Sequence, residues 1–211
     1  MKPIPSAGQI WLVSLLVCAL VVATAFSHLD VEIARRAYGI LGQFRGLATG
    51  LGSAVLLALE ATVVLALVIT RILRGHLSPF REAMALACLT SMCSYAINTS
   101  ALKVFFGVLG PVEVLQGARH MFNFLHGDLN SSFPSGHMVL AGAFAGVFMR
   151  LYRASVLPLA ALLLIAATLL IMGDWHFLSD VVAGAFLGIS AGLLAGELWI
   201  THSSWDGAQS H

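Results

Sequence analysis

Charged residues are scarce in this chain. Only 10% of its 211 residues are Asp, Glu, Lys or Arg, whereas a soluble domain carries about 25%. Its hydrophobic content of 59% and mean hydropathy of +0.91 leave too little polar surface to face water. The net charge of +1 gives no sign of a nucleic-acid partner. These shortages exclude an ordinary soluble domain and indicate that the lipid bilayer is the main solvent.

Cysteine is also scarce. Cys18, Cys88 and Cys93 lie within apolar stretches without CxxC spacing, which favours small buried hydrophobic side chains over disulfides or metal ligands. The sequence lacks HExxH or another tightly spaced ligand pattern, which argues against a metal site. We expect no cofactor. The alternative is a metal site built from more widely spaced residues, namely His120, His126, Asp128, His137, Asp174 and His176.

Long apolar runs are abundant. They cover approximately residues 9–27, 50–72, 83–105, 136–151, 155–173 and 178–200. Each is long enough, or nearly so, to cross a hydrocarbon core of about 30 Å as a helix. The first run could be a signal peptide, but its length favours an uncleaved helix. We therefore expect an all-α integral membrane bundle of six transmembrane helices, with residues 1–211 forming a single domain.

The basic residues predict the orientation. With the N-terminus inside, the inner basic residues are Lys2, Arg71, Arg74, Arg81, Arg150 and Arg153. The outer ones are Arg35, Arg36, Arg45, Lys103 and Arg119. The inner arginines lie in short loops, where the positive-inside rule works best. We therefore expect both termini in the cytoplasm. The expected location is a bacterial inner membrane.

Two polar features have more than one interpretation. Residues 28–49 mix charged and apolar side chains, which fits either an amphipathic interfacial helix or a connecting loop. Glu60 lies in the middle of the second run and is either a functional carboxylate or a hydrogen-bonded side chain facing the bundle. Charges deep in several spans would indicate a transporter, and only Glu60 fits that alternative.

Ionisable residues concentrate between Lys103 and His137 and between Asp174 and Asp180. The third span ends near Lys103, the fourth begins near His137, and the fifth and sixth meet around Asp174. An even number of crossings separates the end of the third span from the start of the sixth. All these residues therefore face one side of the membrane, whichever way the chain is inserted.

The fourth span opens with Pro134, Ser135, Gly136 and His137. Proline and serine suit a helix start, where free N–H groups and a partial positive charge attract a phosphate. Gly136 would let a ligand approach the backbone closely. His137 is suited to protonating a leaving alkoxide.

His176 and Asp180 are spaced i, i+4 and would share one helix face. A carboxylate there fixes the imidazole tautomer and activates the ring as a nucleophile. Lys103 adds a mobile positive charge. A lone interfacial His is usually a solvated loop residue, and a lone His-x-x-x-Asp pattern is common by chance. Two such sites at converging helix starts favour phosphate chemistry instead.

These motifs resemble those of the type 2 phosphatidic acid phosphatase (PAP2) superfamily. Residues 134–137 and 176–184 are similar to its second and third signature motifs, and residues 101–107 followed by Gly110-Pro111 are similar to the first. The resemblance covers residues 95–200 and extends to the layout of six spans. The catalytic motifs would then lie within residues 103–180.

The resemblance implies a lipid phosphatase that acts on a membrane lipid phosphate without a metal. His176 would attack the phosphorus and form a phosphohistidine, which Asp180 would orient and stabilise. His137 would protonate the leaving group. The phosphoryl oxygens would be held by Lys103, Ser135 and the Gly136 backbone.

Two arginines of the family pattern are missing. Gly110 stands seven residues after Lys103, and Leu170 stands six residues before His176. A phosphomonoester is close to a dianion, which two bidentate guanidinium groups would hold strongly. Arg119 lies in the same loop and is either a replacement for one arginine or a surface loop charge.

Two other functions account for the missing arginines. A headgroup transferase or phosphodiesterase of the sphingomyelin synthase type would act on a monoanionic phosphodiester, and Gly127-Asp128 and Asp174 are similar to that arrangement. A non-catalytic lipid-binding membrane protein is the second alternative. The retained His137, His176 and Asp180 argue against it.

Overall fold

The computed structural model describes residues 6–41 and 52–202, and every regular element in them is helical. The six long helices are α1 (Ala7–Thr24), α4 (Ser53–Arg74), α5 (Pro79–Ile97), α8 (Gly136–Leu151), α9 (Val156–Met172) and α10 (Leu178–His202). They coincide closely with the six predicted apolar runs. The predicted all-α class is therefore confirmed for the described residues.

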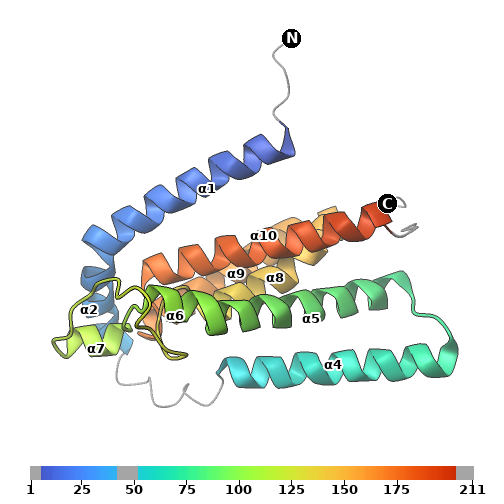
Figure 1. Cartoon of the computed structure of the whole chain (residues 1–211), viewed down its shortest axis with the longest axis horizontal. Helices are drawn as coiled ribbons and strands as arrows, with labels where there is room; N and C mark the ends of the chain where they lie inside the picture. The colour runs from blue at the N-terminus through green and yellow to red at the C-terminus, as the bar shows by residue number, and fades with distance from the viewer. Residues whose placement is uncertain (1–5, 42–51, 203–211) are drawn as a thin grey trace, which may run out of the picture.

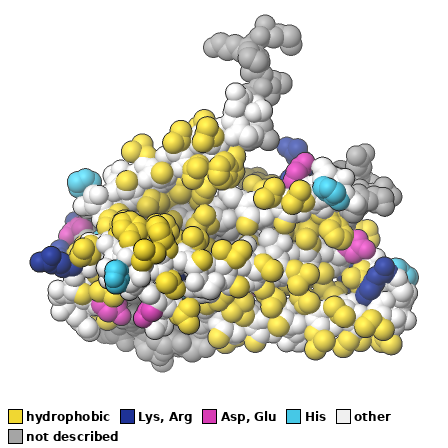
Figure 2. Space-filling model, in the orientation of Figure 1, with side chains coloured by type: hydrophobic (Ala, Val, Ile, Leu, Met, Phe, Trp, Pro, Cys, Tyr) yellow, Lys and Arg dark blue, Asp and Glu magenta, His cyan; other side chains and the backbone are white. Residues whose placement is uncertain are grey.

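Five helical stretches are long and apolar enough to cross a membrane. They are Gly8–Ile40, Ser53–Arg74, Pro79–Leu115, Arg153–Met172 and Leu178–His202. The shorter α8 has 16 residues, or about 24 Å, and most of them are buried against neighbouring helices. Hydrophobic side chains cover the middle of the visible face, while charged side chains gather at its two ends (Figure 2). The protein is an integral membrane protein.

Glycines allow α8 and α10 to pack closely. A Cβ atom on Gly146 would lie 2.6 Å from the carbonyl oxygen of Ile189, and one on Gly192 would lie 2.3 Å from that of Ala143. Both contacts are too short for real side chains, so only glycine fits. Small residues of this kind let helix backbones approach each other in lipid. The tight α8–α10 pair forms the centre of the bundle.

The segment 28–49 forms a helix in its described part. After α1, a π-helical turn η1 (Ala25–Leu29) leads into α2 (Asp30–Leu41), and the rest of the segment lies outside the described residues. The helix is amphipathic, with Asp30 on a buried face and Glu32 paired with two arginines on the exposed face. The helical alternative is therefore correct, and its inner face packs on protein.

The third span continues beyond α5. A π-helical segment, η3 (Asn98–Leu102), leads into α6 (Lys103–Phe106), which ends at Gly107 with a φ of +60°. The predicted run, which ends near residue 105, therefore agrees with the end of this helical stretch at Phe106. This extension places Lys103 at the same end of the bundle as α2 (Figure 1).

The chain between α6 and α8 folds back along α6 after a short helix, α7 (Pro111–Leu115). The Gly127 N–H group donates to the carbonyl oxygen of Val104 at 3.0 Å. A Cβ atom on Gly127 would lie 2.2 Å from the carbonyl oxygen of Lys103, so the loop needs glycine there. The loop is thus held directly against the helix that carries Lys103.

Figure 1 shows α2, α6, α7 and the start of α10 together at one end of the bundle. The start of α1, the end of α10 and the α4–α5 turn lie toward the other end. Glu60 lies within α4, is buried, and faces Ser91 of α5 inside the bundle. This placement favours the interpretation of Glu60 as a bundle-facing side chain.

Candidate active site

Asp180 is the centre of a buried hydrogen-bond cluster at the start of α10. Its Oδ2 atom lies 3.4 Å from Nδ1 of His176 and accepts the Phe177 N–H group at 2.9 Å. The Ser132 hydroxyl donates to the same oxygen, and Ser132 Oγ lies 3.3 Å from Nδ1 of His176. Asp180, Ser132 and His176 are all buried. The cluster fixes the His176 ring from one side.

This arrangement determines the tautomer of His176. A carboxylate can only accept hydrogen bonds, so the nitrogen that faces Asp180, Nδ1, carries the proton. The other nitrogen, Nε2, then keeps its lone pair in the neutral ring. An imidazole held in this way can attack an electrophile, and the carboxylate stabilises the positive charge that develops.

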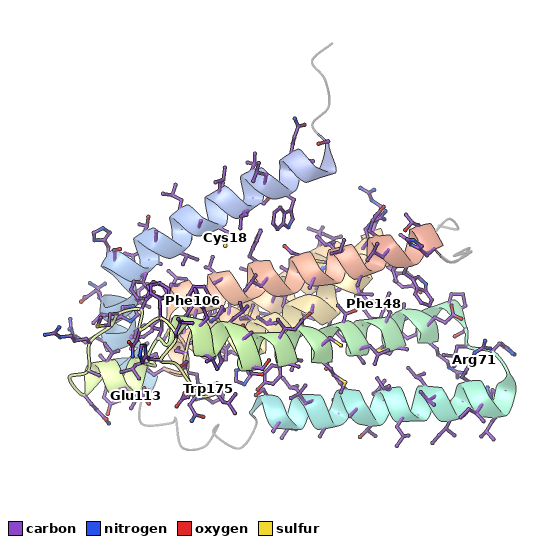
Figure 3. The ribbon with its side chains drawn as sticks, viewed as in Figure 1. Cys18, Arg71, Phe106, Glu113, Phe148 and Trp175 are labelled. Atoms are coloured by element: carbon purple, nitrogen blue, oxygen red, sulfur yellow. The ribbon has the colours of Figure 1, made fainter. Side chains whose placement is uncertain are left out.

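His137 lies in the first turn of α8 and faces His176. The centroids of the two rings are 5.7 Å apart, and the His137 ring also stacks on Trp175 at 6.0 Å. The Nε2 atom of His137 is buried and has no hydrogen-bond partner in the described part of the chain. Figure 3 places Trp175 at the same end of the bundle as Phe106, away from Arg71. The two histidines can therefore act on one group between them.

Ser135 is the N-cap residue of α8, as the sequence predicts. Its Oγ atom accepts the Met138 N–H group at 3.4 Å, and its own N–H group donates to the carbonyl oxygen of Asp180 at 3.0 Å. The free N–H groups of the first turn of α8 therefore lie beside the His176–Asp180 pair. They supply the partial positive charge that an anion requires.

An aromatic ring packs against Gly136 where a side chain would otherwise stand. A Cβ atom there would lie 2.9 Å from Cε2 of Tyr95 and 3.8 Å from Nδ2 of Asn98. The need for glycine therefore has a packing cause, which the sequence alone did not suggest. The backbone N–H group is what Gly136 can offer to a ligand.

Lys103 and Arg119 occupy different environments. Lys103 is buried, with 9% of its surface exposed, and interacts electrostatically with Asp180, Asp128 and His137. Arg119 is exposed in the loop between α7 and α8. Lys103 thus belongs to the site, whereas Arg119 is an exposed residue of the loop.

Comparison with known proteins decides the family. The family model described as the PAP2 superfamily matches residues 84–203, which include every motif residue discussed above. The chain belongs to the PAP2 superfamily. No curated protein matches it in sequence.

One solved PAP2 structure has a similar fold. It is a transmembrane PAP2-type phosphatidylglycerolphosphate phosphatase from Bacillus subtilis, and the likeness covers 92% of this chain and 98% of that one. The TM-score is 0.59 and the sequence identity is 17%. At this identity the match supports the membrane fold. PAP2 membership supports a phosphatase-type enzyme.

The two positions that lack the PAP2 arginines have other structural roles. Leu170 is 6% exposed and packs in an apolar cluster with Met138 and Val181, while its carbonyl oxygen accepts the N–H group of His176 at 3.4 Å. Gly110 is the N-cap of α7 and lies next to Glu113. A guanidinium group at Leu170 would lie among apolar side chains, whereas at Gly110 only the Glu113 carboxylate lies within 4 Å of an added Cβ atom.

The six widely spaced metal-ligand candidates do not gather into a cluster. His120 pairs with Asp30 at 3.2 Å, and His126 bonds to the carbonyl oxygen of Phe124 at 2.7 Å. Within residues 6–41 and 52–202, no three His, Cys, Asp or Glu side chains are placed to share an ion.

Two polar residues of this cluster, Ser132 and Asp30, were given no role from the sequence, and a third, His120, was considered only as a metal ligand. Ser132 bridges His176 and Asp180, and Asp30 and His120 lie behind them. Ser132 precedes the Phe-Pro-Ser-Gly-His sequence closely enough to have been considered as part of the site. Asp30 is 149 residues from its partner Ser179, and nothing in the local sequence indicates that contact.

Proposed function

We propose that this protein is a lipid phosphatase that transfers the phosphoryl group of a membrane lipid phosphate to His176 and then to water. The observation that carries the proposal is the buried His176 ring, held through Nδ1 by Asp180 and Ser132 and facing His137. This is a nucleophile with an orienting carboxylate and a second imidazole within reach of the same phosphorus. Family membership supports the same class of reaction.

The reaction has two steps. Nε2 of His176 attacks the phosphorus, the bond from phosphorus to the lipid oxygen breaks, and His137 gives a proton to the departing alkoxide. In the second step His137 takes a proton from a water molecule, which attacks the phosphohistidine and releases inorganic phosphate. The phosphorus–nitrogen bond breaks in this second step and returns His176 to its neutral form. Asp180 stabilises the positive charge that the ring carries while it is bonded to phosphorus, and no electrons are exchanged.

Positive groups around the phosphorus hold the phosphoryl oxygens. Lys103 supplies a buried charge, and the first turn of α8 supplies N–H groups from Gly136 onward, capped by Ser135. Arg119 replaces one of the two missing arginines by folding over the phosphate once the substrate is bound. The clamp therefore combines one fixed lysine with one arginine recruited from the exposed loop.

A second function is favoured by a specific observation. Leu170 is part of an apolar cluster and Gly110 caps α7, so neither position itself supplies a positive charge. A phosphodiester carries one negative charge instead of nearly two and needs less compensation. A headgroup transferase or phosphodiesterase of the sphingomyelin synthase type, with the same His176 nucleophile, is the alternative.

The catalytic end faces the outside of a bacterial inner membrane, with both termini in the cytoplasm and the bilayer itself as the source of substrate. The arginines around the α4–α5 and α8–α9 turns support this orientation. An exposed loop residue such as Leu129, changed to Cys, would be labelled by a membrane-impermeant thiol reagent added to intact spheroplasts. Labelling only after lysis would show that the protein has the opposite orientation.

The test of function uses purified protein in nanodiscs with a panel of phosphomonoester and phosphodiester lipids. Release of inorganic phosphate from a monoester supports the phosphatase, and transfer or release of a headgroup from a diester supports the alternative. His176→Ala is expected to abolish either activity, and Glu32→Gln, on the exposed face of α2, is the matched control. Full turnover by His176→Ala would overturn both.

A further inference from the structure

A second histidine–carboxylate pair lies directly behind the catalytic cluster. Nε2 of His120, in the loop before α8, lies 3.2 Å from Oδ2 of Asp30 in α2. Asp30 is 1% exposed, and the His120 side chain is 7% exposed. Burying such groups in a membrane protein costs free energy unless they are well paired. The pair is therefore buried at a cost in folding free energy, although neither residue takes part in the proposed chemistry.

Asp30 caps the helix that carries the catalytic carboxylate. Its Oδ1 atom accepts the Ser179 N–H group at 3.0 Å, and its Oδ2 atom accepts the Ser179 hydroxyl. The Ser179 N–H group belongs to the first turn of α10, where helix N–H groups lack partners within the helix. A carboxylate at this position also interacts favourably with the helix dipole. Asp30 thus fixes Ser179, the residue immediately before Asp180 in the first turn of α10.

His120 is linked to His176 through aromatic contacts with the next residue in the chain, Phe177. Its ring stacks on Phe26 with centroids 4.1 Å apart and lies 4.2 Å from the ring of Phe177. Phe177 follows His176 in the chain, and its N–H group donates to Asp180. The pair therefore contacts Phe177, which follows His176, and Ser179, which precedes Asp180. No hydrogen bond, ion pair or ring contact of the pair with His176 or Asp180 themselves is present among the described residues.

We propose that Asp30 and His120 are positioning residues that set the distance between His176 and Asp180 from behind. They act through Ser179 and Phe177, so the N-terminal segment of the chain, which lies outside the family match, becomes part of the catalytic apparatus. The inference rests on the proposed role of His176. It assigns the α1–α2 segment a function in catalysis beyond anchoring the protein in the membrane.

The first test compares Asp30→Asn with Glu32→Gln, its neighbour on the exposed face of the same helix. Asparagine keeps an acceptor for Ser179 but loses the charge that holds His120. We expect kcat to fall about 100-fold with KM within about twofold, because a small misplacement of catalytic groups has this effect. Glu32→Gln should match the wild type. An unchanged kcat, or an effect confined to KM, would overturn the proposal.

A double-mutant cycle separates positioning from simple stabilisation. If Asp30 acts through Asp180, then Asp30→Asn should cost much less in a background that already carries Asp180→Asn. Equal costs in both backgrounds, accompanied by a matching loss of thermal stability, would assign Asp30 a purely structural role. The variants His120→Gln and His120→Phe separate the hydrogen bond from the ring stacking, and the glutamine variant should retain more turnover.

A third measurement does not depend on turnover. The rate at which diethyl pyrocarbonate modifies His176 in the detergent-solubilised protein, followed by mass spectrometry of its peptides, reports the reactivity of that imidazole. We expect Asp30→Asn to change this rate severalfold and Glu32→Gln to leave it unchanged. If no lipid is turned over but the rate changes, the positioning role stands and the proposed function fails. An unchanged rate would contradict the positioning role.

Discussion

Ser132 donates its hydroxyl to the carboxylate oxygen of Asp180 that also faces His176. The serine comes from the loop before α8, whereas the other two residues belong to the start of α10. One hydroxyl therefore joins the two helix starts that were predicted to converge. The His176–Asp180 pair is held by the loop as well as by the i, i+4 spacing along the helix.

Replacing Ser132 with alanine should lower kcat by about 10- to 100-fold with little change in KM. A hydrogen bond to a charged group contributes about 1.5–3 kcal/mol, and each 1.36 kcal/mol in the barrier is about tenfold in rate. Steady-state turnover in nanodiscs is the measurement. Ser131→Ala is the control, because the Ser131 Oγ atom accepts the Asp128 N–H group and not a catalytic one. Equal activity of the two variants would show that Ser132 does not support Asp180.

Restoring the family arginines should give opposite results at the two positions. Leu170→Arg places a charge in an apolar cluster and should reduce the yield of folded protein and its melting temperature. Gly110→Arg should fold, because its Cβ would contact only the flexible Glu113 carboxylate, at 2.9 Å. Size-exclusion chromatography and thermal unfolding in detergent measure both. A stable, more active Leu170→Arg protein would mean that the cluster hides a usable clamp position.

Arg119→Ala should lower kcat/KM for a phosphomonoester about tenfold or more, because a charge-assisted hydrogen bond to the phosphate contributes about 1.5–3 kcal/mol. The matched control is Arg35→Ala, an exposed arginine in an ion pair with Glu32. If Arg119→Ala behaves like the control, Arg119 is only a loop charge and Lys103 works with the helix N-terminus alone.

Gly184→Ala should destabilise the protein and lower its activity together. The added Cβ would lie 2.5 Å from the carbonyl oxygen of Ser135, which would push α10 away from the start of α8. Overpacking of this kind costs about 1–3 kcal/mol. Gly39→Ala is the control, because no atom lies within 4 Å of its added Cβ. The melting temperature of the control should equal or exceed that of the wild type, and an equally stable Gly184→Ala would contradict the α8–α10 packing described here.

Much of the fold follows from the sequence because lipid imposes a simple rule. Backbone groups in a bilayer must bond within a helix, so apolar runs of sufficient length mark the spans. The start of α8 was also predictable, since Pro134 and Ser135 are typical of a helix N-terminus. The π-helical segment η3 within the third span was not, because nothing in the local sequence marks a change of helical hydrogen bonding at Asn98.

The site was only partly predictable for a related reason. The spacing of His176 and Asp180 is a local property, so their contact could be expected from the helix period. Asp30 contacts Ser179 across most of the chain, and such contacts depend on how α2 turns under the bundle. The requirement for glycine at Gly136 depends in the same way on Tyr95 from another helix.

The central claim is that His176 becomes phosphorylated during turnover. The direct measurement uses a lipid phosphate labelled at phosphorus, a quench in base during the steady state to preserve the phosphorus–nitrogen bond, and peptide mapping by mass spectrometry. The account predicts label on His176 in the wild type and none in His176→Ala. Turnover with the label on another residue, or with no labelled intermediate in rapid-quench experiments, would contradict it.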